Sequence, residues 1–166
     1  MALTRDPQLV VADEPTTALD VTVQAQVIAL LNDLRDKLGF AMVFVSHDLA
    51  LVAELSHRIT VMYAGQVVES APTGELLTDP RHEYTRGLLG SVLSIEDGSE
   101  RLHQIPGTVP SPRDFATGDR FAARSQSGAA RRAERPAFRR LPGTDHYVAL
   151  HDAADATPPL ALEDAR

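Results

Sequence analysis

The sequence predicts an α/β fold over residues 1–94, followed by a weakly structured C-terminal tail. Residues 9–12 and 40–45 are short apolar runs without polar alternation, which is the pattern of parallel strands buried on both faces. An apolar stripe with helical spacing lies between these two runs. From residue 95 onwards prolines cluster and large apolar side chains become rare, so we expect little stable packing there.

The predicted helix between the two strands has a signal at each end. Asp20 can cap its N-terminus, and Gly39 is placed to end it. Its apolar positions recur every three or four residues, as one face of a helix requires. They are Val23, Val27, Leu30, Leu31, Leu34 and Leu38. Together these features predict one amphipathic helix of about five turns.

Three further elements are expected before the tail. Residues 46–48 can cap a short helix. Residues 59–63 and 66–69 flank Ala64-Gly65 and predict a β-hairpin. A helix over residues 83–93 follows, and the composition changes soon after it. We therefore place a domain boundary near residue 95.

Composition excludes several kinds of site. The 166 residues contain no cysteine, so no disulfide, thiolate zinc site or thiolate-held iron–sulfur cluster is possible. The net charge of −7 argues against nonspecific binding to nucleic acid. No apolar run reaches the roughly 18 residues of a membrane span. The chain starts without the pattern of a secretory signal, so the cytoplasm is the default compartment.

One stretch is strongly basic. Residues 120–140 contain seven arginines and one glutamate, and could bind phosphates or acidic lipid headgroups. Base stacking is poorly supported, because Phe121 and Phe138 are the only aromatic residues of the stretch and lie at its edges. We favour a solvated linker face.

Two carboxylates, Asp13 and Glu14, directly follow the first predicted strand. Ligands of open α/β sheets bind at the carboxyl ends of the strands. Carboxylate oxygens suit Mg²⁺, and Glu14 could orient or deprotonate an attacking water. Taken alone, the pattern favours two solvated acids at a strand end.

The lysine content limits what nucleotide chemistry is possible. A phosphate-binding P-loop needs a lysine within G-x-x-x-x-G-K-[ST]. Lys37 is the only lysine, and no glycine precedes it at that spacing. The 166 residues therefore contain no P-loop.

Three motifs carry a family resemblance. Residues 13–20, Asp-Glu-Pro-Thr-Thr-Ala-Leu-Asp, closely resemble the Walker B and D-loop segment of ABC-transporter ATPases. Residues 45–48, Val-Ser-His-Asp, resemble the switch-histidine loop of that family, and residues 62–69 resemble the hairpin that follows. The motifs occur in the family's order and at its spacing.

Other segments narrow the resemblance to the oligopeptide and dipeptide importers. Residues 20–27 and 80–89 look like that subfamily, as does the tail from 105 to 122. The resemblance covers the chain from its start to about residue 150. It makes residues 1–94 the C-terminal portion of an ABC nucleotide-binding domain and residues 95–166 a peptide-transporter-type extension.

The resemblance implies roles for four residues, with ATP and Mg²⁺ as cofactors. Asp13 would hold Mg²⁺ through water, and Glu14 would be the general base or the group that orients water. Asp20 would face a partner subunit across a nucleotide sandwich. His47 would contact the γ-phosphate; its alternative is a helix-start histidine with a local hydrogen bond.

The resemblance also implies partners and a location. They are a second ATPase subunit and transmembrane permease subunits, with the chain in the cytoplasm, peripheral to the inner face of the cell membrane. In many relatives the tail carries four cysteines thought to hold an iron–sulfur cluster. The matching positions here are Asp119, Ser125, Arg132 and Leu150, so no cluster is expected.

The remaining histidines give no metal-ligand spacing that supports a site. They are His57, His82, His103, His146 and His151. The last two are five residues apart in the tail, and we expect no metal there.

Two functions remain open. The P-loop, glutamine loop and signature segment have no counterpart, so the chain looks like the C-terminal half of an ATPase with an incomplete sheet. It is either a fragment of the ATP-hydrolysing subunit of a peptide importer, or a non-catalytic remnant or partner-binding module. Asp13, Glu14 and Asp20 place like charges near any bound phosphate, at a cost on the order of 1–4 kcal/mol for a pair about 4 Å apart. We therefore expect no useful ATP affinity from these 166 residues alone.

Overall fold

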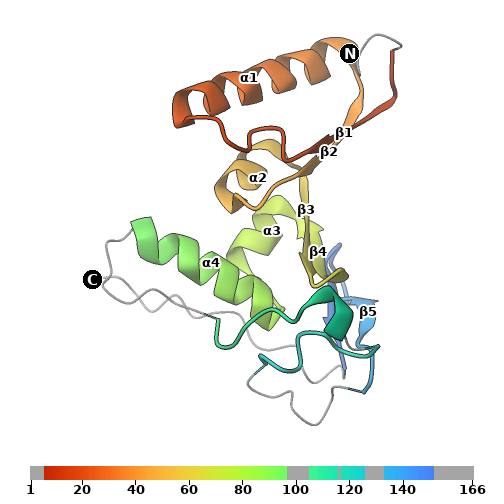
Figure 1. The fold of residues 1–166 in the computed structure, drawn as a ribbon. Helices are drawn as coiled ribbons and strands as arrows, with labels where there is room; N and C mark the ends of the chain where they lie inside the picture. Colours follow the sequence, from red (N-terminus) through yellow and green to blue (C-terminus); the bar gives the residue numbers. More distant parts are fainter. Residues whose placement is uncertain (1–5, 97–104, 116, 126–132, 152–166) are drawn as a thin grey trace, which may run out of the picture. The chain divides into compact units, whose positions relative to one another are not determined.

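The computed structural model describes residues 6–96, 105–115, 117–125 and 133–151 (Figure 1). Its helices and small sheets confirm the predicted α/β class. The chain forms two compact units, Met1–Ser56 and His57–Arg166, called unit 1 and unit 2 below. Unit 2 contains residues on both sides of position 95. The division into a nucleotide-binding portion (1–94) and an extension (95–166) stays a prediction.

Unit 1 is a βαβα segment. Strands β1 (Leu9–Asp13) and β2 (Ala41–Val45) are joined by helix α1 (Val21–Leu38), and helix α2 (Leu49–Leu55) follows. The two strands run parallel, with all five residues of each strand paired. This confirms the parallel arrangement predicted from the two apolar runs.

The predicted helix ends of unit 1 are confirmed. The Asp20 carboxylate accepts a hydrogen bond from the Val23 N–H at 2.9 Å, which caps α1. Gly39 ends the helix with a φ of 71°, a left-handed conformation that favours glycine. Asp48 caps α2 by accepting from the N–H groups of Ala50 and Leu51.

The apolar stripe of α1 is centred differently from the prediction. Ile28, which the stripe omitted, is only 3% exposed and is the one buried residue of the helix. Val27, Leu31 and Leu34 are half-buried, whereas the other predicted members are exposed. Those exposed members are Val23, Leu30 and Leu38. Two strands are too narrow to cover the full width of the stripe.

The apolar runs would be buried on both faces in a complete sheet, but the two-stranded sheet of unit 1 leaves one face uncovered, as expected for an incomplete sheet. Alternate side chains are half-buried or exposed along β1 and β2. Leu9, Val11, Val43 and Val45 are 44–63% exposed on one face, where the strand pairing makes them neighbours. No described element of unit 1 covers this face, which we call the open face.

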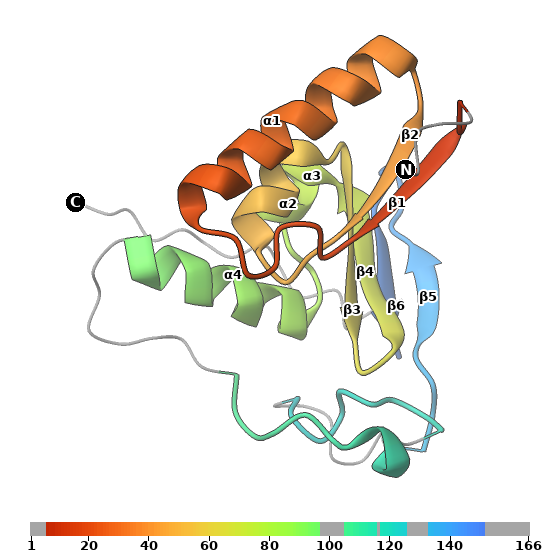
Figure 2. The same ribbon diagram turned by 45° about the horizontal axis from the view of Figure 1, so that its top comes forward.

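Unit 2 is built around a four-stranded antiparallel sheet in the order β3–β4–β6–β5 (Figure 2). Its strands are β3 (Arg58–Tyr63), β4 (Gln66–Pro72), β5 (Ala137–Arg140) and β6 (Tyr147–Leu150). Its helices are α3 (Thr73–Thr78), α4 (Glu83–Glu96) and a 3-10 turn at Pro112–Asp114. The hairpin predicted around Ala64-Gly65 is confirmed, with φ of 47° and 77° at the two turn residues.

The tail is more ordered than its composition suggests. Strands β5 and β6 belong to it, so the expectation of weak structure is wrong for these segments. Phe121 and Val148 are buried in unit 2, at 3% and 0% exposure. The ring of Phe121 packs edge-on against Tyr63, with 5.2 Å between ring centroids. Residues 152–166 lie outside the described residues.

A buried carboxylate–imidazole pair joins the tail to β4. The Glu69 side chain is fully buried and accepts from His146 Nε2 at 2.7 Å. It also accepts from the backbone N–H groups of Arg81 (2.6 Å) and His82 (3.0 Å). These donors satisfy a charge that would otherwise be costly to bury.

The open face should cause self-association of the 166-residue chain. Covering a few hundred Å² of apolar surface contributes roughly 5–10 kcal/mol at about 25 cal/mol per Å². We expect oligomers by size-exclusion chromatography with light scattering. The double variant Val11→Lys/Val43→Lys should weaken association at least about tenfold, because burying the new charges is unfavourable. The control Met62→Lys introduces a charge at an exposed apolar site of unit 2. A wild-type monomer would contradict this account.

Removing the His146 imidazole should destabilise unit 2. In His146→Ala the Glu69 carboxylate stays buried without its side-chain donor, which costs about 3 kcal/mol. His146→Gln keeps an N–H donor and should lose less. Urea denaturation measures both, with His57→Ala as an exposed control. A loss below about 0.5 kcal/mol in His146→Ala would mean that the pair is not stabilising.

Candidate functional site

The parallel pairing of unit 1 brings two sequence motifs to one edge of the sheet. Beyond the last paired residue of β1, the Glu14 N–H donates to the Val45 carbonyl at 2.9 Å. This bond extends the strand contact by one step and fixes where the chain leaves each strand. Residues after β1 and after β2 therefore meet at the carboxyl ends of the strands, where ligands of α/β sheets bind.

Glu14 and His47 form the centre of this edge. His47 Nδ1 lies 3.2 Å from Glu14 Oε1, although the residues are 33 positions apart. The hydroxyl of Thr17 donates to the other carboxylate oxygen, Oε2, at 2.9 Å. Glu14 and His47 keep 48% and 78% of their side-chain surface exposed, so an incoming ligand can reach both groups.

The surrounding donors hold Glu14 in its ionised form. The hydrogen bond from His47, and after it the one from Thr17, lowers the pKa of the Glu14 carboxyl below its usual value. Since the carboxylate can only accept, Nδ1 of His47 carries the proton of the contact.

The loop that carries Glu14 is conformationally unusual. Glu14 has a φ of 45° and Ala18 a φ of 66°, in the left-handed region that side chains other than glycine rarely adopt. The Thr17 N–H donates to the Glu14 carbonyl at 3.2 Å, which closes the turn. The turn aims the carboxylate of Glu14 towards the end of β2.

Asp13 and Asp20, the other two predicted site residues, are not part of the Glu14–His47 contact. Asp13 is exposed at the end of β1 and offers one set of carboxylate oxygens. Among the described residues, no group of three side chains could hold a metal ion. Asp13 therefore fits Mg²⁺ only in the usual manner, in which phosphates and water supply the other ligands. Asp20 is engaged as the cap of α1, and its expected role towards a partner stays a prediction.

The contact of Thr17 with Glu14 was not predicted from the sequence. A local pattern in the sequence could have indicated it, because a hydroxyl three residues after Glu14 in a turn can hydrogen-bond to the Glu14 side chain. For His47, the alternative of a local hydrogen bond at the helix start is not what the structure shows. The ring instead contacts Glu14 across the two strand ends.

The tail histidines also have partners that the sequence did not reveal. His151 Nε2 lies 2.9 Å from Asp119 Oδ2, while Asp119 Oδ1 accepts from two backbone N–H groups. Ser125 donates to Glu83 at 2.7 Å, and Leu150 is buried. Three of the four positions compared with cluster cysteines therefore take part in protein contacts; Arg132 lies outside the described residues, as does His103.

The expectation of a solvated arginine face is wrong for two residues. Arg120 donates to the Ala64 carbonyl and lies over the ring of Phe115. Arg124 donates to the carbonyls of residues 105 and 106, both at 2.7 Å. Arg120 therefore attaches the tail to the β3–β4 turn, and Arg124 joins two segments of the tail to each other.

Comparison with known proteins identifies the relatives of this chain. The family described as "Oligopeptide/dipeptide transporter, C-terminal region" matches residues 68–130. The oligopeptide transport ATP-binding protein OppD of Bacillus subtilis is 46% identical over 169 residues, covering 98% of this chain and 47% of OppD. This chain is homologous to the C-terminal region of oligopeptide and dipeptide ABC-transporter ATP-binding proteins.

A second relative supports this assignment. The dipeptide transport ATP-binding protein DppD of Lactococcus lactis is 44% identical over 126 residues, which cover 76% of this chain and 36% of DppD. The chain thus spans less than half the length of these curated relatives. The resemblance predicted from the motifs is confirmed, and the activity of the whole relatives is not thereby assigned to this chain. Within the described part of the chain, no helix has the length and apolarity to cross a lipid bilayer.

Removing either donor should raise the pKa of Glu14. His47→Ala should have the larger effect and Thr17→Val the smaller, since the imidazole contact lowers this pKa more than the hydroxyl does. The pKa is measured from the pH dependence of the Glu14 side-chain carboxyl signal in ¹³C NMR. His57→Ala, in unit 2, serves as the control and should leave the pKa of Glu14 unchanged. If neither His47→Ala nor Thr17→Val shifts it, the contacts of Glu14 are not those described.

Proposed function

We propose that this chain supplies the carboxylate–histidine part of the ATP-hydrolysing site in a subunit of a peptide ABC importer. The observation that supports this most strongly is the contact of Glu14 with His47 and Thr17 at the carboxyl ends of two parallel strands. Homology to OppD and DppD supports the class of protein.

Under this proposal each residue has a defined task. Glu14, ionised and held by two donors, orients the attacking water and accepts its proton. His47 uses Nε2 to reach the γ-phosphate, while Asp13 is the residue that would hold Mg²⁺ and Asp20 faces a second ATPase subunit. Bound Mg²⁺ would neutralise charge on the phosphates.

The open face fits the same proposal. A two-stranded parallel sheet with one uncovered apolar face is what part of a larger ABC ATPase sheet would leave. Residues 1–94 would belong to the nucleotide-binding domain and residues 95–166 to the extension. The partners would be a second ATPase subunit and permease subunits, at the cytoplasmic face of the membrane.

A second function has its own support. The 166 residues contain no P-loop, and the open face offers apolar surface to another protein. A non-catalytic module that docks on an intact ATPase or on permease subunits would need neither Glu14 nor His47. The two functions therefore differ in whether substitution at Glu14 matters.

A chimera can separate them. We replace the matching C-terminal part of Bacillus subtilis OppD with this chain and measure ATP turnover. We expect turnover in the chimera, and a loss of about 10²–10⁴-fold in Glu14→Gln, because the amide cannot take the proton.

The matched control is Glu54→Gln, which makes the same change at an exposed position of α2. It should retain full turnover. Equal turnover in Glu14→Gln and Glu54→Gln would favour the docking module. Micromolar ATP binding or turnover by the 166 residues alone would contradict our account of the missing P-loop.

A further inference from the structure

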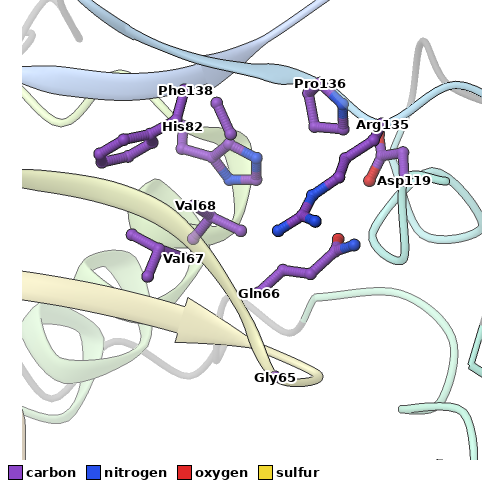
Figure 3. A pocket seen from close by; sticks show the side chains of 10 residues that line it. Gly65, Gln66, Val67, Val68, His82, Asp119, Arg135, Pro136 and Phe138 are labelled. Carbon is purple, nitrogen blue, oxygen red and sulfur yellow. The ribbon is translucent and has the colours of Figure 1, made fainter. Parts of the chain in front are cut away.

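Unit 2 contains a cavity that shares no residue with the contact of Glu14, His47 and Thr17. Its volume is about 310 Å³, at the lower end of the range for small-molecule sites. It lies beside the β3–β4 turn and is lined by residues of β4, β5 and β6 and by His82, just before α4 (Figure 3). Its apolar wall includes Val68, Phe138 and Ala149.

Two of the polar side chains that line this cavity are already engaged. The Gln66 amide donates to the Gly118 carbonyl at 2.9 Å and accepts from the Arg120 N–H at 3.3 Å. Asp119 accepts from two backbone N–H groups and contacts His151 through its second oxygen. Neither side chain is arranged to bind a ligand.

The groups that remain are hydrogen-bond donors. Nδ1 of His82 accepts from the Tyr84 N–H at 3.1 Å, so in the neutral ring the proton lies on Nε2. Burial lowers the pKa of His82, which favours this neutral form. Figure 3 shows the imidazole and the guanidinium of Arg135 turned towards the same space. Arg135 makes no ion pair with any of the described residues.

We propose that this cavity binds a small organic carboxylate with an apolar body. The carboxylate lies between the Arg135 guanidinium and the Nε2–H of His82, two donors that match an anionic acceptor. The apolar body contacts Val68, Phe138 and Ala149. The ligand is a free short-chain acid or the C-terminus of a short peptide, which share this chemistry.

The surroundings select against more highly charged anions. Glu69, Glu83 and Asp119 all act electrostatically on His82. Arg86 also acts on His82, in the opposite sense. Arg135 can offset one negative charge, whereas a doubly charged phosphate would be repelled by the three carboxylates more strongly than a carboxylate would. The cavity shares no residue with the contact of Glu14, His47 and Thr17, so the proposal does not depend on the proposed ATPase role.

Isothermal titration calorimetry of the 166-residue chain tests the site. Hexanoate and the dipeptide Ala-Leu are the two carboxylate probes, and hexanamide, Ala-Leu amide and inorganic phosphate are the comparisons. We expect at least one carboxylate to bind with a dissociation constant of about 1 mM or tighter, and its amide at least about tenfold more weakly. Which carboxylate binds more tightly identifies the source.

The variant Arg135→Gln should weaken carboxylate binding at least about tenfold, since it removes a charge-assisted hydrogen bond. Arg139→Gln is the matched control, an exposed arginine on β5 that does not line the cavity. Circular dichroism checks that both variants fold. No binding of either carboxylate, equal binding of acid and amide, tighter binding of phosphate, or equal loss in the two variants would each overturn the proposal.

Discussion

Backbone hydrogen bonds between β1 and β2 bring Glu14 within reach of His47 in unit 1. The parallel pairing makes both strands end at the same edge, and the bond from the Glu14 N–H to the Val45 carbonyl fixes their relative register there. A slip of one residue would turn alternate side chains to the opposite face. The geometry of the Glu14–His47 contact therefore depends on the pairing of a two-stranded sheet that leaves the open face uncovered.

Unit 2 depends on buried charge instead. Glu69 is held by His146 and by two backbone N–H groups, and Asp119 is held by His151 and by two others. The Glu69–His146 contact attaches the tail to β4, whereas the contacts of Asp119 join parts of the tail to one another, all without any cysteine. Burying the Glu69–His146 pair carries a desolvation cost, so loss of its donor should destabilise the contact between the tail and β4.

What the sequence could predict is mostly local. The caps at Asp20 and Asp48, the turn at Ala64-Gly65 and the two parallel strands follow from signals within a few residues. The buried face of α1 was not predicted correctly, because the sequence alone does not show that a two-stranded sheet leaves Ile28 as the buried residue of the helix. Local signals were sufficient wherever a single backbone group decided the conformation.

Long-range partners could not be predicted in this way. His146 lies 77 residues from Glu69, and β5 and β6 become strands only by pairing with each other and with β4. Arginine-rich composition suggested a solvated face, yet Arg120 and Arg124 reach particular carbonyl groups. The motifs indicated Glu14 and His47 as site residues. The contact between Thr17 and Glu14 became apparent only from the conformation of the turn.

The most direct test of the central claim is the pH–rate profile of the OppD chimera carrying Thr17→Val. The Thr17 hydroxyl donates to the Glu14 carboxylate and helps to keep the Glu14 pKa low. If Glu14 is the base, removing the Thr17 hydroxyl should raise the Glu14 pKa. The acidic limb of the profile should then move to higher pH, because the carboxylate becomes protonated at a higher pH. Thr22→Val, at an exposed position of α1, should leave the profile unchanged. An acidic limb that stays in place in Thr17→Val would contradict the role assigned to Glu14.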